Sequence, residues 1–287
     1  MKNKLKQFAN NIWSQFGEDG IIQKVFEILP KQEVNWCVEF GAWDGKHLSN
    51  THELISNYSW KGVLIEGNKK KIPDLEKTYK NSNNVTLINK LINFEGVDTL
   101  DNILKPSNIP FDFELLSIDI DGNDYHIWES IKNYSPKVVI IEFNPSIPSD
   151  VEFVQEKEFS VNHGSSLLSL IKLGKLKGYE IIATTLCNGF FVRKEYYNLF
   201  EMPDNSITNI WDSESQHPRI FQLYDGTLVL TEEFKLIWSN DYVKKYDLQK
   251  LPRFLRHFSD SPNWKGFYNK FFRKIYNKLQ AIKNKRH

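Results

Sequence analysis

The sequence contains little cysteine and no strong excess of either charge. Its 287 residues include two cysteines, Cys37 and Cys187, and neither belongs to a CxxC pair. A disulfide framework and a cysteine-rich zinc site are therefore poorly supported. The 37 basic and 36 acidic residues leave a net charge of +1, which gives no global sign of nucleic-acid binding.

Long apolar runs are also missing. No stretch of the sequence approaches the roughly 18 apolar residues that cross a bilayer. The first residues, MKNKLKQFANNIW, lack the continuous apolar segment of a secretory signal, so we expect them to remain in the mature protein. On this exclusion of export signals alone, the sequence predicts a cytoplasmic protein.

Short apolar runs alternate with amphipathic ones between residues 34 and 193. The predicted strands cover 36–40, 62–66, 85–88, 115–119, 138–142, 179–182 and 189–192. Most are continuous apolar runs, which is typical of strands covered by helices on both faces. The alternation predicts an α/β fold with a doubly wound, mostly parallel seven-stranded sheet, whose last two strands form an antiparallel hairpin.

Amphipathic segments between the strands predict the helices, for which we expect 50–58, 70–80, 125–133 and 165–174. With an N-terminal helix before the first strand, the predicted main domain covers residues 1–200. Residues 201–287 lose the alternation and are rich in aromatic residues and lysine. They are expected to form a C-terminal extension.

The first predicted strand ends in a turn with glycine and acidic residues, VEFGAWDG. Gly41 permits a tight turn and a closely approaching ligand, and Glu39 and Asp44 add negative charge beside it. A dinucleotide fingerprint needs a second glycine where Trp43 stands, so that a pyrophosphate can reach the backbone. The two acids would repel a diphosphate but attract the ammonium and sulfonium groups of S-adenosylmethionine (SAM). The turn therefore favours SAM over NAD.

The second predicted strand ends in an acid, Glu66, 21 residues after Gly45. An acid in this place can accept hydrogen bonds from both ribose hydroxyls of an adenosine. Taken singly, Glu66 also suits a helix N-cap, and Gly41 and Gly45 suit an ordinary turn. Together these three residues predict a site for the adenosine part of SAM.

Four segments, in this order, resemble the FkbM-like family of class I SAM-dependent methyltransferases. They are SQFGEDG at 14–20, VEFGAWDG at 38–45, LIEGN at 64–68 and LLSIDIDGNDYHIW at 115–128. The resemblance covers residues 12 to 193 and implies that Glu39, Gly41, Asp44 and Glu66 bind SAM. It also implies that the N-terminal segment around Gln15 folds over the cofactor.

The resemblance further implies a reaction and an acceptor. Members of this family are expected to O-methylate sugars, nucleotide-linked sugars or other small hydroxylated metabolites in surface-polysaccharide or natural-product pathways. Many of them read KIDVEG after the fourth strand, whereas this chain reads SIDIDG, with Ser117 and Asp121 in place of lysine and glutamate. Catalytic details of the family are therefore not transferred to this chain.

Oxygen-bearing side chains follow the fourth and fifth predicted strands: Asp119 and Asp121, then Glu142 and Asn144. In one interpretation these four residues ligate Mg²⁺, which lowers the pKa of the acceptor hydroxyl. A related group of sugar O-methyltransferases binds a divalent metal from these same two strand ends. In another, Asp119 or Asp121 contacts SAM or the acceptor directly, and a histidine is the base. The sequence DGND also suits a turn without any chemistry.

His163 is the candidate base, in the segment NHGSS at 162–166. It follows the fifth predicted strand, where substrate loops usually lie, and the ordinary imidazole pKa of about 6.5 suits proton abstraction near neutrality. The alternative is an exposed loop histidine without a role in the chemistry.

The end of the chain predicts a basic amphipathic helix. Residues 265–287 contain eight lysines and arginines and no acidic residue, with apolar residues at helical spacing. Such a helix can contact an anionic membrane surface, or it can pack on the domain with its lysines in water.

Two classes of function follow. The first is a methyltransferase acting on a small carbohydrate-related acceptor, and the second is a non-catalytic binding protein that keeps the fold and associates with a partner or membrane through its C-terminal region. A nucleic-acid methyltransferase is disfavoured by the near-neutral charge and by the lack of an NPPY-like motif.

Overall fold

The computed structural model describes residues 4–211, 218–223, 227–236, 241–248, 271, 274–275 and 278. The chain divides into two units, Met1–Ser213 and Glu214–His287. Nearly all of the chemistry expected from the sequence falls in the first unit.

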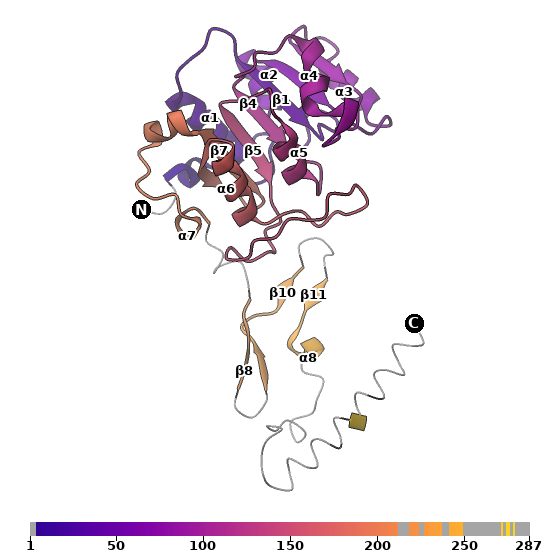
Figure 1. Ribbon diagram of the computed structural model, residues 1–287, viewed down its shortest axis with the longest axis vertical. Helices are drawn as coiled ribbons and strands as arrows, with labels where there is room; N and C mark the ends of the chain where they lie inside the picture. Colours follow the sequence, from indigo (N-terminus) through magenta and orange to yellow (C-terminus); the bar gives the residue numbers. More distant parts are fainter. Residues whose placement is uncertain are drawn as a thin grey trace. The chain divides into compact units, whose positions relative to one another are not determined.

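A seven-stranded sheet forms the centre of the first unit (Figure 1). Its strands are β1 (Trp36–Phe40), β2 (Lys61–Ile65), β3 (Val85–Ile88), β4 (Leu115–Ile118), β5 (Val138–Glu142), β6 (Tyr179–Thr184) and β7 (Asn188–Arg193). They lie in the order β3-β2-β1-β4-β5-β7-β6, and β7 runs antiparallel to both of its neighbours. This is the sheet of the class I methyltransferase fold, so the predicted fold class and the antiparallel final hairpin are confirmed.

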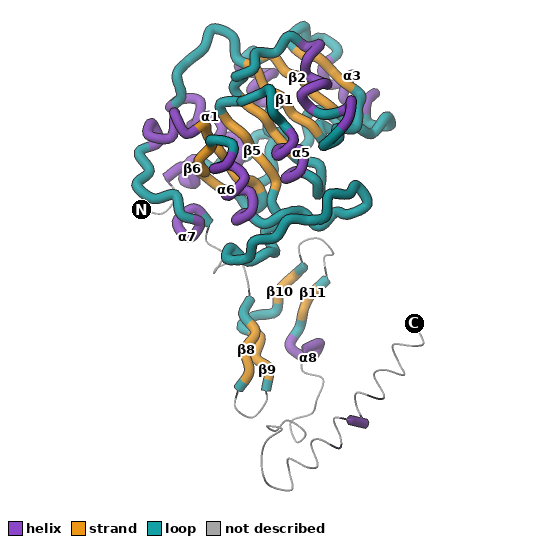
Figure 2. The backbone as a smooth tube through the Cα atoms, viewed as in Figure 1, coloured by secondary structure: helices purple, strands orange, loops and turns teal. Residues whose placement is uncertain are grey.

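Helices cover both faces of the sheet (Figure 2). Together with short 3-10 turns they are η1 (Lys4–Phe8), α1 (Glu18–Ile28), α2 (His52–Tyr58), α3 (Ile72–Tyr79), η2 (Gly96–Asp98), α4 (Leu100–Leu104), η3 (Lys105–Ser107), α5 (Asp124–Ser130), α6 (Leu167–Leu176), η4 (Lys194–Phe200) and α7 (Ile207–Ile210). Each predicted helix has a counterpart within a few residues. The continuous apolar strands are explained by this double cover, since both faces of each strand are removed from water.

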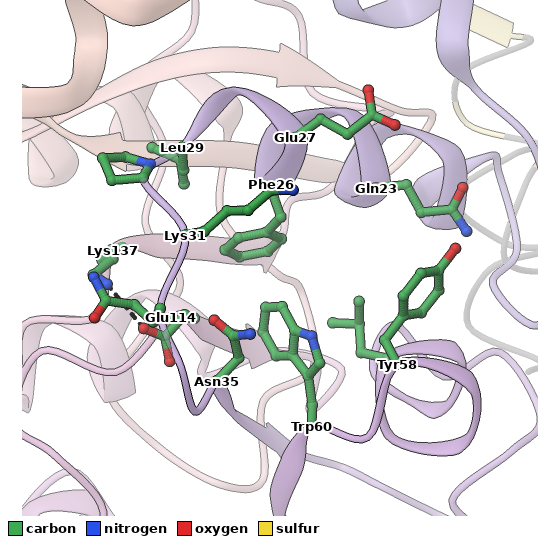
Figure 3. A pocket seen from close by; sticks show the side chains of 13 residues that line it. Gln23, Phe26, Glu27, Leu29, Lys31, Asn35, Tyr58, Trp60, Glu114 and Lys137 are labelled. Atoms are coloured by element: carbon green, nitrogen blue, oxygen red, sulfur yellow. Dashed lines mark hydrogen bonds and ion pairs between the residues drawn. The ribbon is translucent and has the colours of Figure 1, made fainter.

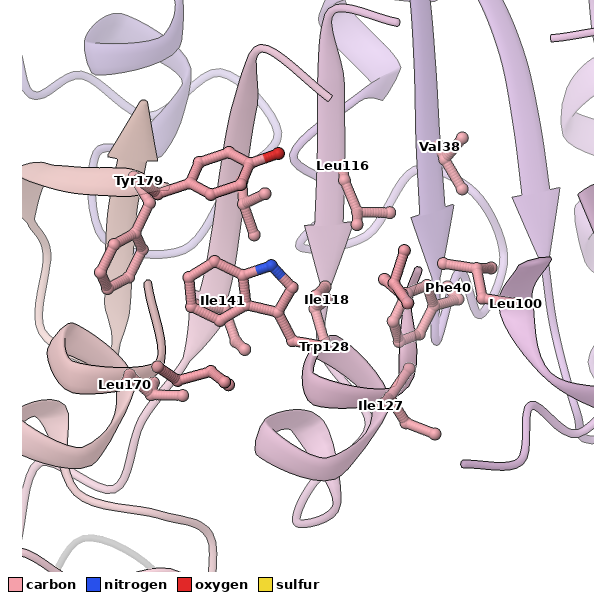
Figure 4. Close-up of a cluster of buried hydrophobic side chains, with 14 of the residues drawn as sticks. Val38, Phe40, Leu100, Leu116, Ile118, Ile127, Trp128, Ile141, Leu170 and Tyr179 are labelled. Atoms are coloured by element: carbon pink, nitrogen blue, oxygen red, sulfur yellow. The ribbon is translucent and has the colours of Figure 1, made fainter. Parts of the chain in front are cut away.

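Two apolar cores result, one on each face. Residues of α1, α2 and α3 pack on one face of the sheet, and residues of α4, α5 and α6 pack on the other. Trp128 of α5 is fully buried in the second core, where its ring contacts those of Tyr179 and Phe191 (Figure 4). Burying a side chain of this size contributes about 3 kcal/mol. The helices thus fix the strand ends that carry the polar residues.

The second unit contains short elements: the antiparallel pairs β8 (Ile220–Gln222) with β9 (Leu228–Leu230) and β10 (Phe234–Lys235) with β11 (Tyr242–Val243), and then α8 (Lys245–Leu248). The predicted basic helix at 265–287 lies outside the described residues, except that Phe271, Lys274, Ile275 and Lys278 are helical. No helix within the described part of the chain has both the length and the apolar character to cross a membrane.

Candidate functional site

Gly41 lies where the ends of β1 and β4 meet. Its φ of +76° is in the left-handed region, and a β-carbon at this position would lie 1.8 Å from the carbonyl oxygen of Asp119. Only glycine can occupy both the conformation and the space. The turn after β1 is therefore in direct contact with the residue that begins the turn after β4.

The rest of this turn is held by α3. Tyr79 donates from its hydroxyl to the carbonyl oxygen of Gly45 at 2.7 Å, and Thr78 donates to that of Asp44 at 2.7 Å. The Asp44 side chain accepts hydrogen bonds from the backbone N–H groups of Lys46 and His47. Partial burial opposes ionisation of Asp44, but these two N–H groups outweigh it and lower its pKa. Asp44 therefore carries its negative charge within the turn.

Trp43 occupies the position where a dinucleotide site has glycine. It has a φ of +47°, and its ring is 40% exposed. The ammonium group of Lys71 lies 4.1 Å from the ring centroid, and His47 meets the ring edge-on. A left-handed tryptophan is strained by about 1–3 kcal/mol, so the surrounding contacts must hold it in place. The bulky ring stands where a pyrophosphate would need open backbone.

Glu66 follows β2 and supports the same turn. One carboxylate oxygen accepts from the N–H of Trp43 at 2.8 Å, and the other accepts from that of Asn68 at 2.6 Å. A carboxylate has about four lone-pair sites, so each oxygen retains one for a further donor. The Asn89 amide, which the sequence did not single out, donates to the Glu66 carbonyl oxygen at 2.7 Å and connects the ends of β2 and β3.

Glu39 on β1 is buried and accepts hydrogen bonds from the loop before α2. It accepts three hydrogen bonds, from the hydroxyls of Ser49 and Thr51 and from the N–H of Asn50, at 2.6 to 2.8 Å. Burial raises its pKa despite these donors. The observed contacts of Glu39 thus shape the loop before α2, and its predicted contact with SAM stays a prediction.

Three carboxylates gather at the ends of β4 and β5. Each of Asp119, Asp121 and Glu142 offers an oxygen, and these oxygens lie within 4.8 Å of one another. Among the described residues, no hydrogen-bond donor or cationic side chain is found on these carboxylates. The sequence predicted that these residues converge, and the structure places them together.

This crowding changes the acidity of the cluster. Partial burial, followed by the nearby Asp124 and Asp121, raises the pKa of Asp119 to about 7. The Asp119 side chain itself is open to water, so the crowding of negative charge is the cause that matters most for this group. Burial, followed by Asp119 and Asp124, raises the pKa of Glu142 to about 10. A cation bound here would relieve the repulsion.

Asp124, at the start of α5, holds the turn that presents two of these acids. Its side chain accepts from the N–H groups of Ile120 and Gly122, both at 2.9 Å. Within this turn Asp121 has a φ of +56° and Gly122 a φ of +154°. No individual role was predicted for Asp124. Its position four residues after Ile120, in a run of turn-forming residues, was the available signal.

The cluster fits a divalent cation. Opposite oxygen ligands of Mg²⁺ lie about 4.2 Å apart and those of Ca²⁺ about 5 Å apart. The observed limit of 4.8 Å lies between these values, so small side-chain adjustments would accommodate Mg²⁺. Asn144 is less available, because its side-chain oxygen already accepts from the N–H and the hydroxyl of Ser146. As a fourth ligand it remains a prediction, and it would have to release Ser146.

His163 lies in the long loop between β5 and α6. Its ring is exposed, and its Nδ1 is 3.8 Å from a carboxylate oxygen of Glu156. It is not part of the carboxylate cluster, although its backbone carbonyl accepts from the Asn144 amide at 2.8 Å. The buried Gln155 orders this loop by accepting from the N–H groups of His163 and Gly164. The base role of His163 stays a prediction.

The same loop crosses the turn after β4. The Asn123 amide donates to the Glu158 carbonyl at 3.0 Å, and Phe159 stacks on Phe94, from the segment after β3, with centroids 5.1 Å apart. Figure 1 shows the loop below the ends of β4 and β5. The loop therefore packs against the turn that carries Asp121.

The N-terminal segment around Gln15 is anchored beside the cluster by Glu18. Glu18 accepts from the N–H groups of Gln15 and Phe16 and from the side chains of Thr185 and Asn188. Asn188 is the register partner of Glu142 across β5 and β7. The side chain of Gln15 itself is exposed, and its predicted contact with the cofactor stays a prediction.

No protein-family model matches the sequence, and no curated protein matches it. Among solved structures, the chain is similar to the N-terminal domain of EvdMO1 with S-adenosylhomocysteine (SAH) bound, at 12% identity and a TM-score of 0.39 over 61% of this chain and 80% of that one. It is also similar to a SAM-dependent methyltransferase from Clostridium acetobutylicum ATCC 824, at 10% identity and a TM-score of 0.39. This match covers 61% of this chain and 90% of that one.

A third similar structure is NcsB1, an O-methyltransferase from neocarzinostatin biosynthesis in complex with SAH and 1,4-dihydroxy-2-naphthoic acid. The identity is 10% and the TM-score 0.36, over 60% of this chain and 53% of that one. The fold of this chain follows from its strand order and its antiparallel β7, independently of these matches.

Proposed function

We propose that this protein is a SAM-dependent methyltransferase of the FkbM-like type that methylates a hydroxyl group of a small, carbohydrate-related molecule. The observation that carries the proposal is the arrangement at the carboxyl edge of the sheet. The glycine turn and Glu66 stand at one end of this edge and the three carboxylates at the other, and Gly41 touches Asp119 between them. The reaction would transfer the methyl group of SAM, bound on β1 and β2, to a hydroxyl oxygen of an acceptor bound near β4 and β5, leaving SAH and releasing the hydroxyl proton.

On the donor side, the free lone pairs of Glu66 suit the two hydroxyls of a ribose. The acids near the turn, which include Asp44 and Asp119, suit a ligand with a positively charged sulfonium and ammonium. The Trp43 ring disfavours a dinucleotide, whose diphosphate needs a glycine there. SAM meets these three conditions, and NAD does not.

On the acceptor side, Asp119, Asp121 and Glu142 would hold a divalent cation such as Mg²⁺. When bound, the cation lowers the pKa of a coordinated hydroxyl and makes it a better nucleophile. The side chains themselves would hold the acceptor oxygen in line with the donor, and Asp119, whose pKa is raised to about 7, is a stronger base for the hydroxyl proton than an ordinary aspartate. His163 remains the candidate for a protein base if no metal takes part.

The wider expectations belong to the same proposal. Residues 1–200 form the catalytic domain and 201–287 an extension, and the enzyme works in the cytoplasm on precursors of a surface polysaccharide or natural product. We include nucleotide-linked sugars among the proposed acceptors.

Calorimetric titration tests the proposal directly. We expect SAH to bind with a micromolar Kd and NAD not to bind, and Glu66→Ala to weaken SAH by about 100-fold, because two charge-assisted hydrogen bonds are lost. The matched control is Glu76→Ala, which removes an exposed acid from α3. Failure of SAH to bind a well-folded sample would reject the proposal and favour a non-catalytic binding protein.

A further inference from the structure

A cavity of about 280 Å³ lies at the edge of the sheet opposite the glycine turn and the carboxylates (Figure 3). Among the residues that line it, Asn35, Glu114 and Lys137 each directly precede one of the parallel strands β1, β4 and β5. The cavity therefore belongs to the amino ends of these strands and is separate from the proposed methyl-transfer site. Its volume is close to the lower limit of ordinary small-molecule sites, about 300 Å³.

Apolar and aromatic side chains form the walls. Phe26 of α1 and Trp60 meet edge to face, with ring centroids 4.7 Å apart, and both line the cavity. Leu29 and Leu54 are buried and extend this apolar surface. Flat aromatic walls of this kind select planar, apolar ligands.

A buried ion pair provides the polar part of the lining. The ammonium group of Lys137 donates to Glu114 at 2.9 Å, and the two residues are 4% and 6% exposed. Glu114 uses its other oxygen to accept from the N–H of Trp36 at 2.7 Å. Lys137 has three N–H donors, and within the described part of the chain its ammonium group has only Glu114 as a partner.

Two donors of a buried ammonium group thus remain beside an apolar cavity. Leaving such donors unpaired is costly, so an acceptor in the cavity would be bound favourably. The pair as a whole is neutral, and Glu114 would repel an anion. We propose that this cavity binds a small, uncharged aromatic molecule whose carbonyl oxygen accepts a hydrogen bond from Lys137. The proposal does not depend on methyl transfer.

Acetanilide, which combines a phenyl ring with a neutral carbonyl, is the probe. Ligand-observed NMR titration of the full chain should give a Kd near 1 mM, with benzoate at least tenfold weaker. Asn35→Trp should fill the cavity from its rim and weaken acetanilide at least tenfold. Glu33→Trp is the matched control, because Glu33 lies in the same loop, is exposed and does not line the cavity.

The double variant Lys137→Met, Glu114→Gln tests the recognition group without leaving a buried charge unpaired. We expect it to weaken acetanilide at least tenfold while circular dichroism reports an intact fold. No binding of acetanilide to the wild type, or binding that Asn35→Trp leaves unchanged, overturns the proposal. Binding retained in the double variant, or benzoate binding as tightly as acetanilide, overturns the role given to Lys137 and leaves only an apolar cavity.

Discussion

The acidic residues at the two ends of the sheet's carboxyl edge differ in their hydrogen bonding. On the β1–β2 side, every carboxylate oxygen of Glu39 and Glu66 accepts at least one hydrogen bond from an N–H or hydroxyl group of the protein. On the β4–β5 side, Asp119, Asp121 and Glu142 face one another, and no donor is found on them among the described residues. Paired acids fix the shape of a turn, whereas crowded, unpaired acids store repulsion that a cation can relieve.

The largest expected difference between the two sides concerns turnover. Asp121→Asn should lower methyl transfer from tritiated SAM to free and nucleotide-linked sugars by about 100-fold or more, because several kcal/mol of charge stabilisation are lost. The Kd for SAH should change less than about threefold, since Asp121 lies on the β4–β5 side. The control is Asp112→Asn, a change at an exposed acid. Equal losses of turnover and SAH binding would contradict the proposal that the donor binds on the β1–β2 side and the acceptor on the β4–β5 side.

On the β1–β2 side, a change at an acidic residue should instead lower the stability of the fold. Glu39→Gln replaces an acceptor of three buried hydrogen bonds with an amide that presents donors to donors. We expect a loss of about 2 kcal/mol, which lowers Tm by about 4–8 °C in a domain of this size. Thermal unfolding measures it, with the exposed Glu33→Gln as the control. An unchanged Tm would show that the network contributes little to the fold.

The same contrast explains which features of the fold and the site could be predicted from the sequence. Continuous apolar runs predicted all seven strands to within two residues, because burial on both faces leaves a strong pattern. Convergence of Asp119, Asp121 and Glu142 followed from the parallel strand ends alone. The partners of Glu39 and Glu66 could not be predicted in the same way. They are mainly backbone N–H groups of loops, and a loop's conformation depends on packing rather than on its residue types.

Hydrogen bonds between residues far apart in the chain could not be predicted from the sequence either. Glu18 reaches Thr185 and Asn188, more than 160 residues further along the chain. Neither the spacing of these residues nor the N-terminal motif indicates that contact. His163 shows the opposite problem. Its position after β5 was predicted, but the structure pairs its exposed ring with Glu156 outside the carboxylate cluster.

Addition of a divalent cation should stabilise the folded protein through Asp119, Asp121 and Glu142 and not through the acids on the β1–β2 side. At a Mg²⁺ concentration tenfold above its Kd, the folded protein should gain about 1.4 kcal/mol, or about 3–6 °C in Tm. The gain should disappear in Asp121→Asn and persist in Glu39→Gln. Differential scanning fluorimetry with Mg²⁺, Ca²⁺ and an EDTA control measures it. A shift of the same size in Asp121→Asn would place the cation elsewhere.

The smallest effect concerns pH in the absence of metal. The folded-state pKa of Glu142, about 10, lies above its ordinary value of 4.5, so the folded protein binds this proton more tightly than the unfolded chain does. The free energy of unfolding therefore falls as the pH rises between these values. Glu142→Gln removes this dependence. In EDTA at pH 8 the variant should be more stable than the wild type by on the order of 1 kcal/mol, after allowance for solvent screening.

At pH 4, where Glu142 is protonated in both states, the difference should vanish. Glu156→Gln, a change at an exposed acid outside the cluster, should alter neither value. Because Mg²⁺ neutralises the same repulsion, its addition at pH 8 should bring the wild type up to the metal-free variant or above it. A variant that is less stable than the wild type at pH 8 would mean that Glu142 is engaged like Glu39. The two sides of the edge would then not differ in the way inferred from their contacts.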